Sequence, residues 1–352
     1  MILGRLALFI VAAVATAYSQ TSPNLLVLSK HDHTLAIVDP SSLRVLAKVP
    51  VGDDPHEVIA SADGHTAYVS NYGFGAFHTL TVIDLVERKP LITIDLGPLR
   101  GPHGLDFVQG KVWFTAEAAK AIGSYDPVAG KVDWVMGTGQ NRTHMIHVFP
   151  DARRIITTNV SSATVTILEK TEGRQGMPMG PPPGMPPPSG SQQGPPPGPP
   201  PTPPGGDWNE TVIAVGHGSE GFDVSADGSV AWVANAQDGT ISVVDIAQKK
   251  VTATIEANAR GANRLKFTLE GRLALISAGP DLVVFDVATQ KEVKRVPIGH
   301  GSGGVLIEPG GARAFVACSG DAYVAVIDLK SLTVTGHIEA GGNPDGLAWA
   351  QR

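Results

Sequence analysis

The chain has 352 residues, a formal net charge of -6, and 27 basic residues that are scattered rather than clustered. This charge pattern argues against nucleic acid as the main partner. The single cysteine, Cys318, excludes an intrachain disulfide, and 42% hydrophobic residues can bury a large core. The chain is nevertheless too long for one simple two-layer core, so a repeat architecture is expected.

The first residues have the layout of a secretory signal peptide. One early cation, Arg5, precedes an uncharged apolar run at 6–17, and small residues follow before Gln20. That run is shorter than the roughly 20 residues that cross a bilayer. We therefore predict a signal peptide at 1–19, a mature protein at 20–352 without a membrane span, and a periplasmic or secreted location. A retained N-terminal anchor is the alternative.

A repeat of about 42 residues runs through the mature chain. Its marker is an apolar pair followed by an acidic residue, as in VID at 82–84 and VID at 326–328, and successive markers are spaced by 45, 42, 43, 76, 41 and 42 residues. Short alternating runs between Gly, Asn and Asp turns indicate four strands in each unit. Seven such units predict an all-β, seven-bladed β-propeller of four-stranded antiparallel blades.

The order of the strands predicts how the ring closes. The chain begins with the second strand of a blade at 25–29 and ends with an innermost strand at 346–350. The last strand should complete the first blade from the inside, which hides the edges of the ring. The acidic residue that ends each third strand is expected to accept hydrogen bonds from the following turn, which is a structural role.

The spacing of 76 residues contains a low-complexity insert at 171–207, which holds 15 of the 28 prolines. Proline removes ladder donors, so the insert adds no strands, and it falls in the hairpin between the third and outermost strands of one blade. Lengthening that hairpin costs about 2 kcal/mol of chain-closure entropy, which a propeller can tolerate. Two interpretations stay open: a disordered surface insert, or a polyproline docking site for a protein partner with an aromatic groove.

Residues 67–71 read AYVSN and lead into TVID at 81–84, and residues 231–235 read AWVAN. Both stretches resemble the YVTN-family β-propeller repeat, and all seven units fit its pattern. The resemblance implies the propeller fold but no single activity, because the family mixes binding proteins, enzymes and uncharacterised exported proteins. The third unit, with VWFT at 112–115 and AIGSYDP at 121–127, looks more like the streptogramin (virginiamycin B) lyase repeat. No continuous motif carries that lyase's functional residues onto numbered positions.

Histidines are expected to gather on one face of the propeller. Each innermost strand runs from what we call the upper rim to the lower rim. The upper rim carries the connections into the innermost strands and those between second and third strands. Eight of the 11 histidines fall in these connections, where ordinary loop lengths predict about four. Two similar loops there, GHGS at 216–219 and 299–302, could cradle an anion with backbone N–H groups.

The first residues of the predicted innermost strands form a ring at the upper mouth of the channel. In blade order they are His56, His103, His144, Glu220, Asn263, Gly303 and Asp345. Imidazoles and carboxylates suit a transition metal or a small polar ligand. We predict that His56, His103, His144 and Glu220 hold a metal, with zinc or copper as the candidate cofactor, and that Asp345 also contacts the ligand. Taken singly, each histidine could equally be a solvated loop residue.

Three residues further along the same strands, a second set of side chains faces the channel. Four of its seven members are ionisable: Asp106, His147, Asp223 and Lys266. Unpaired charges in a narrow channel would be expensive, so we expect these groups to pair with one another or with bound water. We include them among the predicted ligand-binding residues.

Three functions remain open. The first is an exported binding module that uses the upper mouth for a small molecule or metal and the rim or insert for a protein partner. The second is a metal-dependent lyase or lactonase-like enzyme at the same site, with one of the ring histidines as general base. The third is a structural interaction protein of the cell envelope. An open coordination position would distinguish the enzyme from the binding module. The sequence does not identify catalytic residues, the ligand or the oligomeric state.

Overall fold

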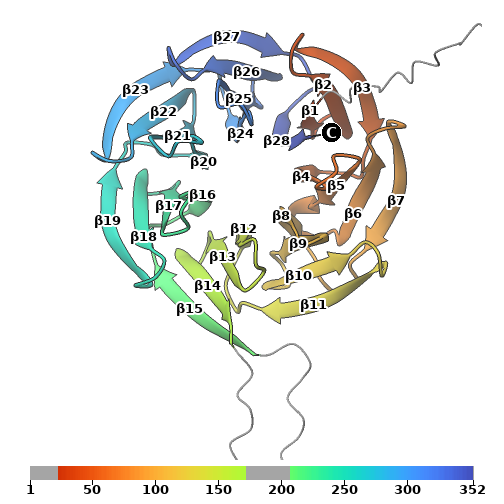
Figure 1. Ribbon diagram of the computed structural model, residues 1–352, viewed down its shortest axis with the longest axis horizontal. Helices are drawn as coiled ribbons and strands as arrows, with labels where there is room; N and C mark the ends of the chain where they lie inside the picture. Colours follow the sequence, from red (N-terminus) through yellow and green to blue (C-terminus); the bar gives the residue numbers. More distant parts are fainter. Residues whose placement is uncertain (1–22, 172–206, 352) are drawn as a thin grey trace, which may run out of the picture.

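The computed structural model describes residues 23–171 and 207–351 and shows seven four-stranded antiparallel sheets arranged in a ring (Figure 1). This confirms the predicted all-β, seven-bladed propeller. Within these residues, no helix is long and apolar enough to cross a membrane. The predicted signal peptide lies outside the described residues, as does the proline insert except for its two ends.

The strands fall into four concentric sets. The innermost are β4 (Pro55–Ala60), β8 (Pro102–Val108), β12 (Thr143–Val148), β16 (Ser219–Val224), β20 (Ala262–Phe267), β24 (Ser302–Ile307) and β28 (Pro344–Ala350). The second set is β1 (Asn24–Ser29), β5 (Thr66–Asn71), β9 (Lys111–Ala116), β13 (Arg154–Asn159), β17 (Val230–Asn235), β21 (Leu273–Ala278) and β25 (Arg313–Cys318).

The two outer sets complete each blade. The third strands are β2 (Thr34–Asp39), β6 (Thr79–Asp84), β10 (Ala121–Asp126), β14 (Thr164–Lys170), β18 (Thr240–Asp245), β22 (Asp281–Asp286) and β26 (Tyr323–Asp328). The outermost are β3 (Arg44–Pro50), β7 (Lys89–Asp95), β11 (Lys131–Gly137), β15 (Trp208–Ala214), β19 (Lys250–Glu256), β23 (Lys291–Pro297) and β27 (Thr333–Ile338). One 3-10 turn, η1 (Gly73–Gly75), lies between β5 and β6.

The ring closes as predicted, because the C-terminal strand β28 pairs with β1. Leu25 lies opposite Trp349, and Val27 lies opposite Leu347. The strand begins at Pro344, two residues earlier than the sequence indicated. One blade therefore contains both ends of the propeller, and no open sheet edge is left between the first and last units.

The core lies between blades rather than inside them. Strand β1 is buried at every residue, whereas the outermost strand β19 alternates exposed and covered positions. One apolar cluster joins Leu26 and Ile37 of the first blade to Val69 and Ile83 of the next. Because each sheet packs against both neighbours, the repeats stabilise one another in the way that face-packed sheets do.

The acidic residues that end the third strands have the structural role that the sequence predicts. In six of the seven blades, the carboxylate accepts backbone N–H groups two or three residues further on. These residues are Asp39, Asp84, Asp126, Asp245, Asp286 and Asp328. They form turns of the Asx type on the lower rim and need no ligand to explain them.

Every innermost strand has a register shift near its second and third residues. In β8, Pro102 pairs with Ala116 and Leu105 pairs with Phe114, so His103 and Gly104 lie in the bulge. A β-bulge re-aims the side chains of its residues. A Cβ atom on Gly104 would lie 2.5 Å from the His144 carbonyl oxygen, so the bulge brings neighbouring innermost strands into backbone contact.

Buried hydroxyl groups lock these bulges together. Thr115 Oγ1 accepts the N–H of Gly104 at 2.9 Å and donates to the carbonyl of His144 in the next blade at 2.8 Å. Ser70, Thr158 and Ser277 occupy the same repeat position, and their hydroxyls donate to the carbonyls of His103, Glu220 and Gly303. The backbone of the predicted ring is therefore fixed by side chains of the second strands.

Replacing residues 172–206 by a short glycine-containing turn should leave the fold intact. The backbone N–H of Thr171 donates to the carbonyl of Asp207 at 2.8 Å, and β14 pairs with β15 along all seven residues, so the hairpin is already closed at its base. Shortening the loop adds about 2 kcal/mol of stability at most. Thermal unfolding should stay one cooperative transition with an equal or higher Tm, whereas a lower or broader transition would mean that the insert packs on the propeller.

The variant Thr115→Val should be less stable by about 2 kcal/mol or more, because it leaves the buried N–H of Gly104 and the carbonyl of His144 without their shared partner. Urea unfolding measures the difference. Thr254→Val is the matched control, since Thr254 is exposed on the outermost strand β19. Equal stability of the two variants would show that the hydroxyl bridge contributes nothing.

Candidate functional site

Two cavities lie along the channel. The upper cavity has a volume of about 270 Å³ and is lined by the ring of residues near the start of the innermost strands. The lower cavity has a volume of about 230 Å³ and is lined by the second channel-facing set. Each ring residue is the second residue of its strand, one later than the sequence indicated. The sequence grouped both sets into one site, and the structure separates them.

The three ring histidines come together in the upper cavity. The ring centroids of His56 and His103 are 4.8 Å apart, and those of His103 and His144 are 3.9 Å apart. Propeller symmetry explains this, because equivalent residues of adjacent innermost strands point at the same axis.

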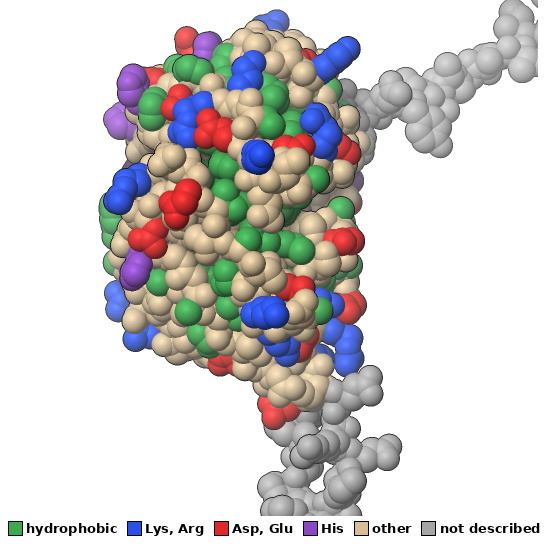
Figure 2. All heavy atoms as spheres, turned by 90° about the vertical axis from the view of Figure 1, so that its left-hand side faces the viewer, with side chains coloured by type: hydrophobic (Ala, Val, Ile, Leu, Met, Phe, Trp, Pro, Cys, Tyr) green, Lys and Arg blue, Asp and Glu red, His purple; other side chains and the backbone are tan. Residues whose placement is uncertain are grey.

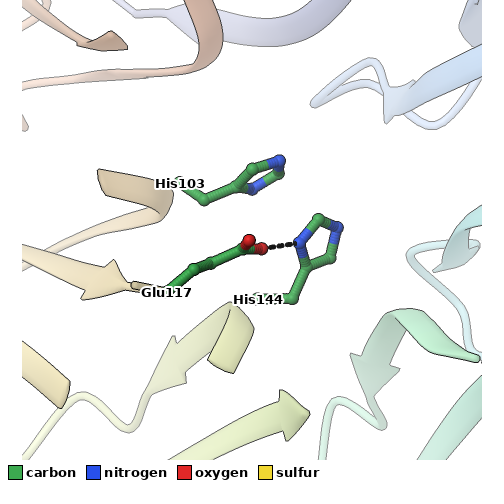
Figure 3. A group of neighbouring side chains, drawn as sticks. All are labelled: His103, Glu117 and His144. Carbon is green, nitrogen blue, oxygen red and sulfur yellow. Dashed lines mark hydrogen bonds and ion pairs between the residues drawn. The ribbon is translucent and has the colours of Figure 1, made fainter. Parts of the chain in front are cut away.

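His103, His144 and Glu117 form the tightest cluster (Figure 3). One ligand atom from each residue lies within 4.8 Å of the others. The side chains of His103, in β8, and Glu117, directly after β9, extend toward His144, and Glu117 Oε1 accepts a hydrogen bond from His144 Nδ1 at 2.5 Å. Within residues 23–171 and 207–351, this is the one group of three such side chains that could hold a metal ion.

Polar neighbours hold the cluster in place. The Tyr72 hydroxyl donates to Glu117 Oε2, and the Arg142 guanidinium lies 3.6 Å from the same oxygen. On the other side, His144 Nε2 lies 2.8 Å from Glu220 Oε2, although its N–H does not point at that oxygen. This second contact is therefore an ion pair without hydrogen-bond geometry, and His144 lies between two carboxylates.

The carboxylates of Glu220 and Glu117 favour the positively charged form of His144. Burial alone would lower the pKa of His144, but Glu220 and Glu117 outweigh burial and raise it. In return, burial would raise the pKa of Glu220, but the charge of His144 outweighs that effect and lowers it to about 2. Of the two imidazoles in the cluster, His144 is therefore the one whose positively charged form the surroundings favour.

His103 has the opposite character. Its side chain is only 2% exposed, and burial, followed by the charges of His144 and His56, lowers its pKa well below the usual value. Its Nδ1 atom is buried and has no hydrogen-bond partner. Leaving a buried polar atom unpaired costs about 1–3 kcal/mol, so this nitrogen indicates a missing partner.

Two residues predicted for the site, His56 and Asp345, belong to a neighbouring network on the same wall. His56 Nε2 lies 3.1 Å from Asp54 Oδ1, and His56 Nδ1 lies 3.5 Å from Asp345 Oδ2. Lys30 Nζ donates to the same Asp345 oxygen at 2.9 Å. Of the four predicted metal ligands, only His103 and His144 belong to the compact cluster. Glu220 contacts His144 from outside the cluster, and Glu117 supplies the carboxylate that was predicted to come from Glu220.

The sequence analysis missed Glu117, Tyr72 and Lys30, which all occupy one repeat position. Each is the first residue after a second strand, and its backbone N–H donates to the residue before an innermost strand, as from Glu117 to the Gly101 carbonyl at 2.9 Å. This bond presents the side chain at the upper mouth. Comparing that position across the seven repeats would have found all three.

An ion pair crosses the channel between the two cavities. Arg264 in β20 pairs with Glu57 in β4, from opposite sides of the ring (Figure 1), and Arg264 lines both cavities. Both residues are third in their strands. They are two residues before the channel-facing fifth residues Ile59 and Lys266, so strand alternation places them on the channel side, and the bulge is the reason that the second residues also reach the channel mouth.

The lower cavity contains the pairs that the sequence predicted. Lys266 Nζ donates to Asp223 Oδ1 at 3.2 Å, and His147 Nδ1 lies 3.9 Å from Asp106 Oδ2. These four residues do not reach the upper cluster, because Arg264 and Glu57 lie between the cavities.

Of the remaining upper-rim histidines, His31, His33, His217 and His300 are exposed and His78 is half-buried. Figure 2 shows that the histidine side chains in view gather mainly along one face of the disc. In the two GHGS loops, the backbone N–H groups of His217 and His300 donate to Asp238 and Asp321. These two backbone donors already have acidic partners and are not available to an anion.

No family model and no curated protein matches this chain. Similar solved structures include a protein of unknown function from Desulfotomaculum acetoxidans, with a TM-score of 0.69 and 14% identity over 91% of this chain and 98% of that one. A candidate 6-phosphogluconolactonase from Bacteroides fragilis has a TM-score of 0.67 and 15% identity over 95% and 99%. Hydrazine synthase from Kuenenia stuttgartiensis has a TM-score of 0.67 and 15% identity over 90% and 99%. At these identities the likeness shows only that the chain shares a β-propeller fold with proteins of different functions.

Proposed function

We propose that the protein is a binding module whose upper cavity holds one divalent transition-metal ion through His103, Glu117 and His144. The observation that carries this proposal is the buried Nδ1 atom of His103, which has no partner and belongs to a cluster of three ligand atoms within 4.8 Å of one another. An ion would give that nitrogen the partner that the protein alone does not supply.

The donor chemistry supports a transition metal. Two imidazole nitrogens and one carboxylate oxygen are a usual ligand set for zinc, and imidazole also suits copper. A metal ligand must carry a free lone pair, and His103 does so because its pKa is held low by burial and by the neighbouring positive charges. Tyr72 at Glu117 and Glu220 at His144 are placed as outer partners that orient the ligands.

A metal-dependent lyase or lactonase-like reaction is the second candidate. The observation that favours it is the size of the upper cavity, about 270 Å³, which leaves room for water or substrate beside a three-residue ligand set. The likeness to a candidate 6-phosphogluconolactonase concerns only the fold and does not decide between binding and catalysis.

Metal-free protein should bind one zinc or copper ion per chain in isothermal titration. His103→Ala and His144→Ala should each weaken binding by about 100-fold or more, beyond the 10–100-fold that loss of an outer partner costs. Tyr72→Phe should weaken binding by only about 10- to 100-fold, because it removes only the hydroxyl that supports Glu117. His300→Ala is the control for adventitious binding, since that imidazole is exposed on the same rim.

Tight zinc binding that survives His103→Ala, or that is lost equally in His300→Ala, would rule out the assigned cluster. Binding to the wild-type protein with no change in any of these variants would place the ion elsewhere. Failure of both zinc and copper to bind the folded metal-free protein would remove the proposal altogether.

The low pKa of His103 also predicts how metal-free stability depends on pH. Below about pH 6.5 the unfolded chain takes up a proton at this position that the folded protein does not, so folding is disfavoured as pH falls. Relative to His103→Gln, the wild type should lose stability between pH 7 and pH 5 by on the order of 1–2 kcal/mol. Urea unfolding at several pH values measures this, with the exposed His65→Gln as control. If the unfolding free energies of the wild type and His103→Gln changed with pH in the same way, the His103 imidazole would take up its proton in the folded protein as it does in the unfolded chain.

A further inference from the structure

The lower cavity is built from two unlike halves. Around the channel, four consecutive blades present Asp106, His147, Asp223 and Lys266, and the other three present Leu306, Ala348 and Ile59. The Arg264–Glu57 ion pair lies between this cavity and the upper one. The result is a chamber with one polar wall and one apolar wall, separate from the metal cluster.

Most charges of the polar wall are already balanced. Lys266 Nζ donates to Asp223 Oδ1 at 3.2 Å, and the other Asp223 oxygen accepts the backbone N–H of Phe267. At the upper end of the chamber, Glu57 is neutralised by Arg264. Neither ion pair leaves a net charge that could bind a charged ligand.

Asp106 is different, because its charge has no close cation. Its two oxygens accept the backbone N–H groups of Phe107 and Val148, both at 2.8 Å. The nearest titratable side chain, His147, lies at 3.9 Å, and burial lowers the pKa of that imidazole and so favours its neutral form. The backbone bonds hold the carboxylate in a fixed orientation, but burial outweighs them and raises the pKa of Asp106. A cation beside the carboxylate would offset that cost of burial.

We propose that the lower cavity is a second binding site, for a small organic amine. The ammonium group pairs with Asp106, and the apolar body of the ligand packs against Ile59, Leu306 and Ala348. A mostly apolar wall with a single charged anchor is the usual form of a small-molecule site, in which the anchor sets the orientation. This site does not depend on the metal ion, since the cross-channel ion pair separates the two cavities.

Three ligands of nearly equal shape and different charge test the proposal: benzylamine, benzyl alcohol and benzoate. Isothermal titration of metal-free wild-type protein should show saturable binding of benzylamine at one site, at least tenfold tighter than benzyl alcohol, and no measurable binding of benzoate. In Asp106→Asn the preference for the amine over the alcohol should fall below about twofold. Asp63→Asn, in an exposed turn of the lower rim, should keep the full preference.

A second variant tests the same site in case Asp106→Asn disturbs the fold. Leu306→Lys places a tethered ammonium group in the cavity and should abolish benzylamine binding, while thermal unfolding reports whether the variant is folded. Benzylamine binding no tighter than that of benzyl alcohol, an unchanged preference in Asp106→Asn, or no saturable amine binding by the folded wild type would each overturn the proposal. Zinc binding is measured in the same samples, so the two sites succeed or fail separately.

Discussion

Backbone contact between neighbouring innermost strands is the constraint on which the channel depends. Seven strands can meet around one axis only if each comes very close to the next, and Gly104 shows how close, since an added Cβ atom would lie 2.5 Å from a carbonyl oxygen of β12. The bulges make this approach, and hydroxyls such as that of Thr115 satisfy the backbone groups that the bulges free. The channel is narrow as a result, and the side chains that enter it must contact one another.

That crowding determines the electrostatics. Ionisable groups in a narrow channel are desolvated, so they persist there only with compensating partners. Arg264 pairs with Glu57 across the axis, and His144 lies between two carboxylates. Above the cross-channel ion pair, the Nδ1 atom of His103 lacks a hydrogen-bond partner, and below it the Asp106 carboxylate lacks a close cation. Both sites assigned to the protein arise from this incomplete compensation.

The fold could be predicted from the sequence because every repeat carries the same spacing, turn chemistry and apolar pattern. The convergence of His103 and His144 was also predictable, since equivalent positions of adjacent blades face one axis. Glu57 and Arg264 were not, because the sequence analysis took two positions three residues apart as the channel-facing sets and passed over the residue between them, and the bulge that brings both the second and third residues to the channel leaves no mark in the sequence. The opposite pKa shifts of His103 and His144 could not be predicted either. The two residues are of the same type, and their shifts depend on burial and on which charged groups lie beside each ring.

Function in a repeated fold is found where the repeats differ. The third position of the innermost strand is glycine in four blades, where it permits backbone contact, and becomes Glu57, Met145 and Arg264 in the others. The long charged side chains of Glu57 and Arg264 at a position suited to glycine carry a desolvation cost, which their ion pair and the hydrogen bonds from Arg264 to Asn263 offset. That pair divides a continuous channel into two chambers with different linings. The division lets one propeller present a nitrogen-rich site at its upper mouth and an amphipathic site below, each with its own chemistry.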